Sequence, residues 1–308
     1  MSKLNLQNKV YNEGRYHSRD WKYESSTKYV FSYDNLIIEA GYFEHFIDGE
    51  MLLPLKRVIE LSTSYGCQFR CKYCASSSIR SVTLLTPDIV FDVFSFIYDD
   101  NGLNHFENIE VSFLGIGDAY YTIDTILSVI PMIISKNNYI VFNVSSCYWT
   151  KTSIAKIEKY RNYIKTIQMT YLSFAIDTVR RIIPGLPPDF TEAQDVIHIL
   201  NDSMFSRFRI NYIMIKDLND SDDDFLEFLR IVSGYKEKTI VRISKMNMTN
   251  AARSNQLQTP EIKELFKLDT ILKHNGVNSY VFYSFQDDNM NCGQLITEKV
   301  GNDGIVAK

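Results

Sequence analysis

The chain has 308 residues, of which 45% are hydrophobic and 23% are charged, and its formal net charge is −4. This composition is ordinary for a globular protein, and it supplies enough apolar material for a large core without disulfide staples. No run of about 18 apolar residues is present, so the sequence predicts no membrane span. The first residues lack an apolar signal region, so we expect a cytoplasmic protein.

The first 55 residues show little regular periodicity. We therefore expect an N-terminal extension over residues 1–55, followed by the main domain over residues 56–308. Basic and aromatic residues are mixed within the first thirty positions, a combination that can bind single-stranded nucleic acid. We favour the other interpretation, in which this segment is a partly ordered arm that packs its aromatic side chains on the domain.

From residue 57 onward, apolar strand-like runs alternate with helix-like runs. Thr86-Pro87-Asp88 has the cap, the proline and the acid of a helix start, Thr259-Pro260-Glu261 repeats the pattern, and Asn275-Gly276 is a stop signal. Alternating elements imply parallel strands joined by right-handed crossovers. The sequence therefore predicts an α/β fold, a partial (β/α)6-type barrel with a short N-terminal extension. The predicted strands cover residues 57–62, 109–114, 139–144, 166–176, 207–215, 239–244 and 277–284.

Three of the five cysteines, Cys67, Cys71 and Cys74, have the spacing C-x3-C-x2-C directly after the first of these strands. The odd number and the clustering argue against a disulfide framework and indicate a metal centre in a reducing compartment. Three thiolates leave one iron of a 4Fe–4S cubane open to a further ligand. Structural zinc, the alternative, usually requires four Cys or His ligands in paired spacings. The motif therefore favours one 4Fe–4S cluster.

This motif, with Tyr73 before its last cysteine, resembles the signature of the radical S-adenosylmethionine (SAM) superfamily. The resemblance implies that the open iron binds the amino and carboxylate groups of SAM. It also implies that one electron cleaves SAM to methionine and a 5′-deoxyadenosyl radical. We accordingly expect a radical SAM enzyme that receives its electron from a donor such as flavodoxin or ferredoxin.

From about residue 37 to residue 295 the chain resembles the RlmN/Cfr family, whose members methylate a carbon of an adenine in ribosomal RNA. The most specific match is the acidic stretch that leads into Cys292-Gly293-Gln294-Leu295. The resemblance implies that Cys292 carries a methyl group taken from one SAM, and that a second SAM converts it into a methylene radical. An inert buried thiol is the alternative for Cys292. Glu39 falls where the family has a glutamate described as a proton acceptor.

Other segments match the family in the same order along the chain. Gly115-Ile116-Gly117-Asp118 falls at a glycine-rich turn that binds the SAM amino group, and glycine permits close approach of a ligand. The family's remaining SAM contacts fall on a serine, on a three-residue segment and on an asparagine. The SAM-binding residues implied by the resemblance are Gly117, Asp118, Ser145, Ala175, Ile176, Asp177 and Asn247.

One family residue is replaced in this chain. Seven residues before the first cluster cysteine, where the family has a second essential cysteine, the chain has Glu60. In the family this second thiol releases the product by forming a disulfide, which a carboxylate cannot do, although Glu60 can accept a proton. Cys147 and Cys292 are the two cysteines left outside the cluster, so we hypothesise that Cys147 is the resolving thiol. The alternative is that Cys147 only packs at the mouth of the barrel.

The substrate expected from the sequence is a small molecule, a peptide or a short RNA. The net charge is negative, residues 1–36 are too few for the family's helical RNA-binding domain, and its basic C-terminal tail is absent. We therefore expect ribosomal RNA to be an unlikely partner, and methyl transfer through Cys292 to a carbon of a non-ribosomal substrate. Two alternatives remain: direct use of the 5′-deoxyadenosyl radical without a methyl carrier, and a degenerate protein that binds a cluster or SAM without turnover.

Overall fold

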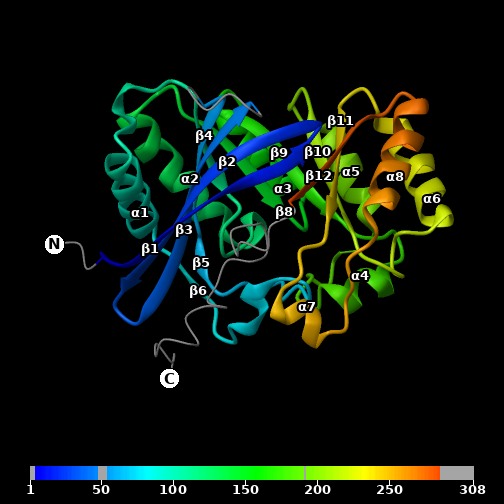
Figure 1. The fold of residues 1–308 in the computed structure, drawn as a ribbon, viewed down its shortest axis with the longest axis horizontal. Helices are drawn as coiled ribbons and strands as arrows, with labels where there is room; N and C mark the ends of the chain where they lie inside the picture. The colour runs from blue at the N-terminus through cyan, green and yellow to red at the C-terminus, as the bar shows by residue number, and fades with distance from the viewer. Residues whose placement is uncertain (1–3, 48–53, 191, 285–308) are drawn as a thin grey trace.

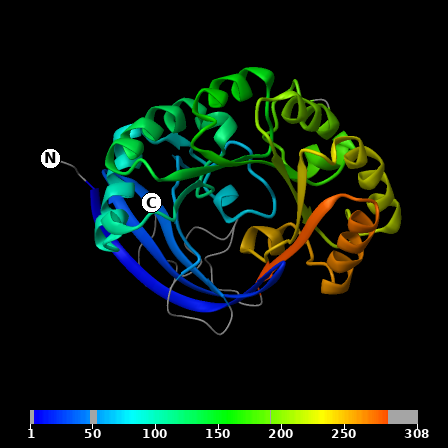
Figure 2. The same cartoon turned by 90° about the horizontal axis from the view of Figure 1, so that it is seen from above.

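The computed structural model describes residues 4–47, 54–190 and 192–284, and within them ten strands form one closed barrel (Figures 1 and 2). Seven of these strands pair in parallel, in chain order, and each overlaps one strand predicted from the sequence. The predicted α/β barrel is therefore confirmed. The parallel strands are β4 (Lys56–Glu60), β7 (Ile109–Phe113), β8 (Val141–Ser146), β9 (Ile164–Tyr171), β10 (Phe208–Met214), β11 (Thr239–Lys245) and β12 (Asn278–Ser284).

Helices cover the outer face of the parallel strands (Figure 2). The predicted start of α1 is confirmed, because the Thr86 side chain accepts a hydrogen bond from the backbone N–H of Ile89 at 3.4 Å. The start predicted at Thr259 is shifted, since α8 begins at Ile262 with Glu261 in the cap position. The helices are α1 (Pro87–Asp100), α2 (Ala119–Lys136), α3 (Lys151–Ile157), α4 (Ile176–Ile182), α5 (Ala193–Asp202), α6 (Asp222–Val232), α7 (Asn250–Ser254) and α8 (Ile262–His274).

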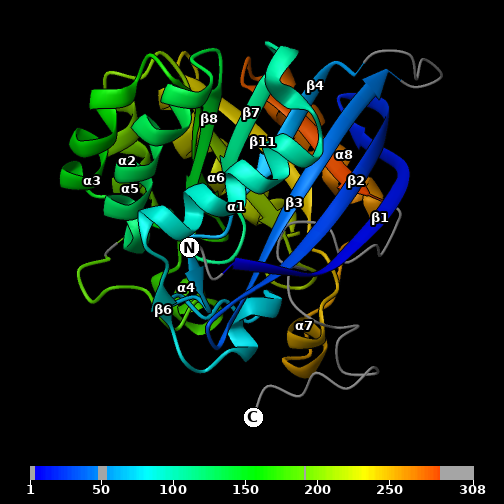
Figure 3. The ribbon, with the colours of Figure 1, turned by 90° about the vertical axis from the view of Figure 1, so that its left-hand side faces the viewer.

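The N-terminal segment differs from the expected extension, because it forms three long antiparallel strands of the same sheet (Figure 3). These are β1 (Leu4–Ser18), β2 (Asp20–Tyr33) and β3 (Leu36–Ile47). β1 pairs with β12 and β3 pairs with β4, so the three strands close the barrel. The region expected as a reduced accessory extension is thus part of the barrel wall.

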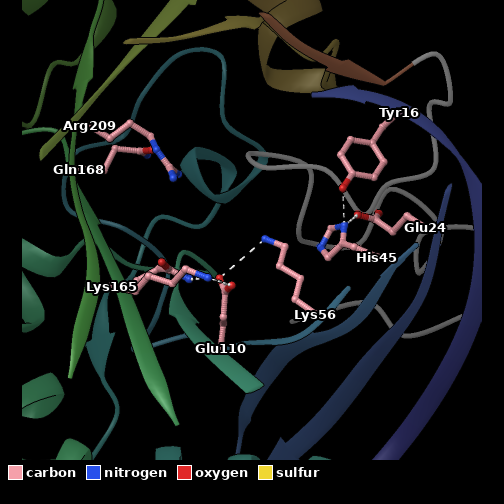
Figure 4. A network of polar contacts seen from close by, with 9 residues as sticks. Tyr16, Glu24, His45, Lys56, Glu110, Lys165, Gln168 and Arg209 are labelled. Carbon is pink, nitrogen blue, oxygen red and sulfur yellow. Dashed lines mark hydrogen bonds and ion pairs between the residues drawn. The ribbon is translucent and has the colours of Figure 1, made fainter. Parts of the chain in front are cut away.

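The two faces of β2 explain why sequence periodicity missed these strands. Near its end, the outward side chains Tyr29 and Phe31 pack on α1, with the rings of Phe31 and Phe96 centred 5.2 Å apart. Its inward face is polar, and Glu24 points into the barrel lumen (Figure 4). A strand whose polar residues face the interior does not follow the usual pattern of apolar residues inside and polar residues outside.

The site end of the barrel is the one where the parallel strands finish. The short strands β5 (Ser64–Tyr65) and β6 (Thr83–Leu84), together with α4 and α7, gather there (Figure 1). In the part of the chain that the structure describes, no helix is both long and apolar enough to cross a membrane.

Candidate functional site

The loop after β4 carries the three cluster cysteines, and all three line one cavity. The backbone of this loop is fixed by neighbouring elements. The N–H of Lys72 donates to the carbonyl of Ile182 in α4 at 2.9 Å, and the Thr249 hydroxyl donates to the carbonyl of Tyr73 at 2.9 Å. Phe69 is fully buried between the cysteines. The loop is therefore held in place independently of any bound group.

The cysteine thiols lie in a dry environment. Burial raises the pKa of Cys74 to about 11 and that of Cys67 well above its usual value, and the neighbouring thiols add to both shifts. Deprotonating Cys67 and Cys74 is therefore favoured by a nearby positive charge, which a metal centre would supply. Among the residues described, no three Cys, His, Asp or Glu side chains already form a site for a single metal ion. Three thiols of one anchored loop in one cavity fit a 4Fe–4S cluster, which Cys67, Cys71 and Cys74 would hold.

The glycine turn after β7 forms the adjoining wall of the cavity. Gly117 has φ +112°, and a Cβ there would lie 2.6 Å from the Thr63 hydroxyl oxygen. A Cβ on Gly115 would lie 2.8 Å from the carbonyl oxygen of Leu61. Larger residues would therefore push the turn off the segment that leads into the cysteine loop, so glycine is required at both positions.

Asp118 ends this turn and caps α2. Its carboxylate accepts hydrogen bonds from the Ser146 hydroxyl and, at 2.9 Å each, from the backbone N–H groups of Tyr120 and Cys147. Burial raises the pKa of Asp118 to about 6, and these hydrogen bonds oppose the shift. The carboxyl group is thus ionised at neutral pH and fixed at the edge of the cavity.

Cys147 lines the same cavity as the cluster cysteines. Interaction with the Cys71 thiol, together with burial, raises the pKa of Cys147 well above its usual value. Its backbone N–H is held by Asp118. The sequence placed Cys147 near the SAM pocket because loops at the carboxyl ends of parallel strands face one opening of a barrel, and the structure brings it to the cysteines themselves.

Ser145 also lines the cavity, and its hydroxyl accepts a hydrogen bond from Gln168 Nε2 at 2.9 Å. The sequence analysis missed Gln168 and Asn211, which line the cavity from β9 and β10. Both are buried polar residues within barrel strands, and each strand carries a further charged residue nearer its start, Lys165 in β9 and Arg209 in β10. Polar residues within a predicted buried strand are the signal that could have identified them, because buried polar groups require partners.

Some predicted site residues lie elsewhere. Ala175, Ile176 and Asp177 are at the start of α4, outside the set that lines the cysteine cavity. Asn247 lines a neighbouring cavity together with Tyr73. Cys292 lies outside the described residues.

The two candidate proton acceptors face the barrel interior at different depths. Glu39 is fully buried and forms an ion pair with Lys28 at 2.8 Å, and its backbone carbonyl accepts a hydrogen bond from Ser62 at 2.5 Å. Glu60 lines a deeper part of the lumen, where burial raises its pKa to about 7 and Arg242 opposes the shift. A carboxyl group with a pKa near neutrality is suited to exchanging protons.

Comparison with known proteins places this geometry in a family context. No family model matches the chain. It is 20% identical over 258 residues to a probable dual-specificity RNA methyltransferase RlmN of Dictyoglomus turgidum, covering 81% of this chain and 71% of that protein. It is also 24% identical over 293 residues to the ribosomal RNA large subunit methyltransferase Cfr of Clostridium botulinum, covering 89% of this chain and 81% of that protein.

Solved structures agree with the fold. A radical SAM methyltransferase from Sphaerobacter thermophilus superposes on 96% of this chain and 81% of its own, with a TM-score of 0.74 and 17% identity. The sequence and fold relatives together support one 4Fe–4S cluster and SAM as the cofactors.

The prediction that ribosomal RNA is an unlikely partner is wrong. It depended on the net charge of −4 and on missing accessory segments. Relatives that match 81% and 89% of this chain are named as RNA methyltransferases, one of them for ribosomal RNA. A formal net charge sums over the whole surface and does not locate the basic residues, so it cannot exclude a phosphate-binding face.

Proposed function

We propose that this chain, an RlmN/Cfr-like radical SAM methyltransferase, methylates a carbon of an RNA base and uses Cys292 as the methyl carrier. The observation that carries the proposal is the single cavity that joins the three cluster cysteines to Gly117, Asp118 and Ser145. The names of the relatives support RNA, including ribosomal RNA, as the substrate class. We also propose a cytoplasmic location, because the three thiols must stay reduced to hold a cluster.

The residues of the cavity have separable roles in this proposal. The cluster, when bound, supplies the electron that cleaves SAM. Asp118, ionised at neutral pH and fixed by three donors, provides a negative charge for the SAM amino group. The glycine turn lets a ligand approach the backbone, and Ser145 offers a hydroxyl that is already oriented by Gln168.

Product release needs a partner for Cys292, and we propose that Cys147 is this resolving thiol. The Cys147 thiolate would attack the Cys292 sulfur, so that an S–S bond forms as the bond between that sulfur and the methylene carbon breaks. The electron pair of the broken bond would go to the base carbon unit, which takes up a proton and leaves as the methylated base, while the two cysteines are left oxidised as a disulfide. The support is that Cys147 lies in the cavity of the cluster cysteines. Glu39 and Glu60 are the proposed proton acceptors, and the pKa of Glu60 near 7 suits that task.

The test is anaerobic reconstitution with iron, sulfide, SAM and dithionite, with large-subunit ribosomal RNA or short adenine-containing RNAs as substrate. Mass spectrometry should detect 5′-deoxyadenosine, S-adenosylhomocysteine, a methylated Cys292 peptide and a methylated nucleoside. A Cys292→Ala variant should lose the methylated peptide and the nucleoside. Formation of 5′-deoxyadenosine without S-adenosylhomocysteine or methylated Cys292 would contradict the proposal and favour direct use of the radical.

A further inference from the structure

A second polar cavity occupies the barrel lumen near the amino ends of the parallel strands. Lys56 is the first residue of β4, and Glu110, Lys165 and Arg209 are each the second residue of their strands. Figure 4 shows these side chains pointing toward one another across the lumen. The cavity shares Gln168 and two other lining residues with the cluster cavity, so the two are stacked along the barrel axis.

Basic groups outnumber acidic groups in this lumen cavity. Four cationic side chains line it, against three carboxyl groups, of which Glu60 has a pKa near 7. Burial places the pKa of His45 well below its usual value, so it adds no charge at neutral pH. By formal charge, the four cationic groups exceed the three carboxyl groups by one. The cationic residues are Lys56, Lys165, Arg209 and Arg242, and the acidic ones are Glu24, Glu60 and Glu110.

The two lysines share one acidic partner, Glu110, which binds Lys165 closely and forms a longer ion pair with Lys56. Glu110 forms an ion pair with Lys165 and accepts a hydrogen bond from Asn143 at 2.9 Å. Lys56 is 3.7 Å from the same carboxylate, which is beyond hydrogen-bond length. The Lys56 ammonium group is thus left with donor capacity that Glu110 does not use.

Arg209 is less satisfied still. Its guanidinium group has one long contact, 3.5 Å to Gln168 Oε1, and its buried Nε has no hydrogen-bond partner in the part of the chain that the structure describes. A buried donor without a partner costs roughly 1–3 kcal/mol, and more when it is charged. The guanidinium fork matches the oxygens of a carboxylate or phosphate in pairs.

We propose that the lumen cavity binds a phosphate-type oxyanion, held by Arg209 and Lys56. The group could arrive as a free oxyanion or as the phosphate of a nucleotide, since both present the same oxygens. Gln168 links this site to the SAM side of the barrel, because its Oε1 contacts Arg209 and its Nε2 donates to Ser145. An oxyanion that draws Arg209 away would free Gln168 Oε1 for another donor.

The test is titration of the reconstituted full-length protein with inorganic phosphate and, separately, with AMP, at constant ionic strength against chloride. Melting temperature and calorimetry are the two readouts. Arg209→Met and Lys56→Met should each weaken phosphate binding by at least about tenfold, because each removes a charged donor. Arg207→Met is the matched control, since Arg207 is exposed just before the same strand, and it should bind as the wild type does.

The outcomes separate the two sources. Binding of phosphate but not AMP identifies a free oxyanion, and binding of AMP but not phosphate identifies a nucleotide phosphate. The proposal is overturned if neither ligand binds the wild type. It is equally overturned if both lumen variants bind as tightly as the wild type. If Arg209→Met does not fold, Arg209→Lys replaces it in the test. This variant keeps the charge, and it should bind the ligand more weakly than the wild type does.

Discussion

Glu60 should make the stability of this protein fall as the pH rises through the neutral range. Its pKa is about 7 in the folded protein because of burial, against 4.5 for an ordinary glutamate. Between these values the folded state holds one more proton than the unfolded state, so the free energy of unfolding decreases with increasing pH. Each unit of pKa difference corresponds to about 1.36 kcal/mol. The Glu60 contribution should therefore change by roughly 2.5 kcal/mol between pH 5 and pH 8.

The measurement is urea denaturation of the wild type and Glu60→Gln at pH 5, 6, 7 and 8, under reducing anaerobic conditions. Other groups titrate in both proteins, so the difference between the two curves isolates Glu60. From pH 5 to pH 8, the free energy of unfolding of the glutamine variant should rise by roughly 2.5 kcal/mol relative to that of the wild type. Glu107→Gln, which changes an exposed glutamate, is the control, and its free energy of unfolding should have the same pH dependence as that of the wild type. A constant difference between wild type and Glu60→Gln would refute the reasoning.

Three further outcomes are expected. Replacing any cluster cysteine with Ala should abolish the iron–sulfur absorbance and all SAM cleavage; stoichiometric zinc in the wild type would contradict this. Gly117→Ala should lower the free energy of unfolding by roughly 1–3 kcal/mol, because of the φ of +112° and the Cβ contact with Thr63 at 2.6 Å. Gly234→Ala is the control, because a Cβ there has no heavy atom within 4 Å, and it should have little effect on the free energy of unfolding. An equal loss in both variants would rule out the backbone conformation and the Thr63 contact as the cause. Under single-turnover conditions Cys147→Ser should accumulate substrate joined to Cys292, seen as added mass; release at the normal rate would remove Cys147 from the mechanism.

The parallel strands could be predicted from sequence because their signal is local. Each is a short run rich in apolar residues between helix signals, and the polar residues that interrupt these runs, such as Arg209 and Asn211, line the lumen. One boundary failed, since the run at 166–176 was taken as a single strand, whereas β9 ends at Tyr171 and α4 begins at Ile176. Apolar runs do not by themselves distinguish the end of a strand from the first turn of a helix.

The cluster loop could be predicted because all its ligands lie within eight residues of one another. The family resemblance implied that the glycine turn and Ser145 belong to the SAM site, and Cys147 was placed nearby from its position after a predicted strand; the structure brings all of them into one cavity. The contacts of Gln168 and Asn211 could not be predicted from the sequence, because the direction in which a side chain points depends on the register of the barrel strands. The lumen network was missed for the same reason, since its members come from strands far apart in sequence.

The N-terminal strands change how the interior of the barrel should be understood. Without them, β4 and β12 would be open edges, each with a row of unpaired backbone groups. With them, the lumen is enclosed, and β2 and β3 bring Glu39, Lys28, Glu24 and His45 into it. One of the two candidate proton acceptors therefore belongs to the segment expected to be an accessory extension. These strands contribute lining residues to the lumen cavity, which shares Leu114, Gln168 and Asn211 with the cysteine cavity, so the charge balance next to the cysteine cavity depends in part on the N-terminal strands.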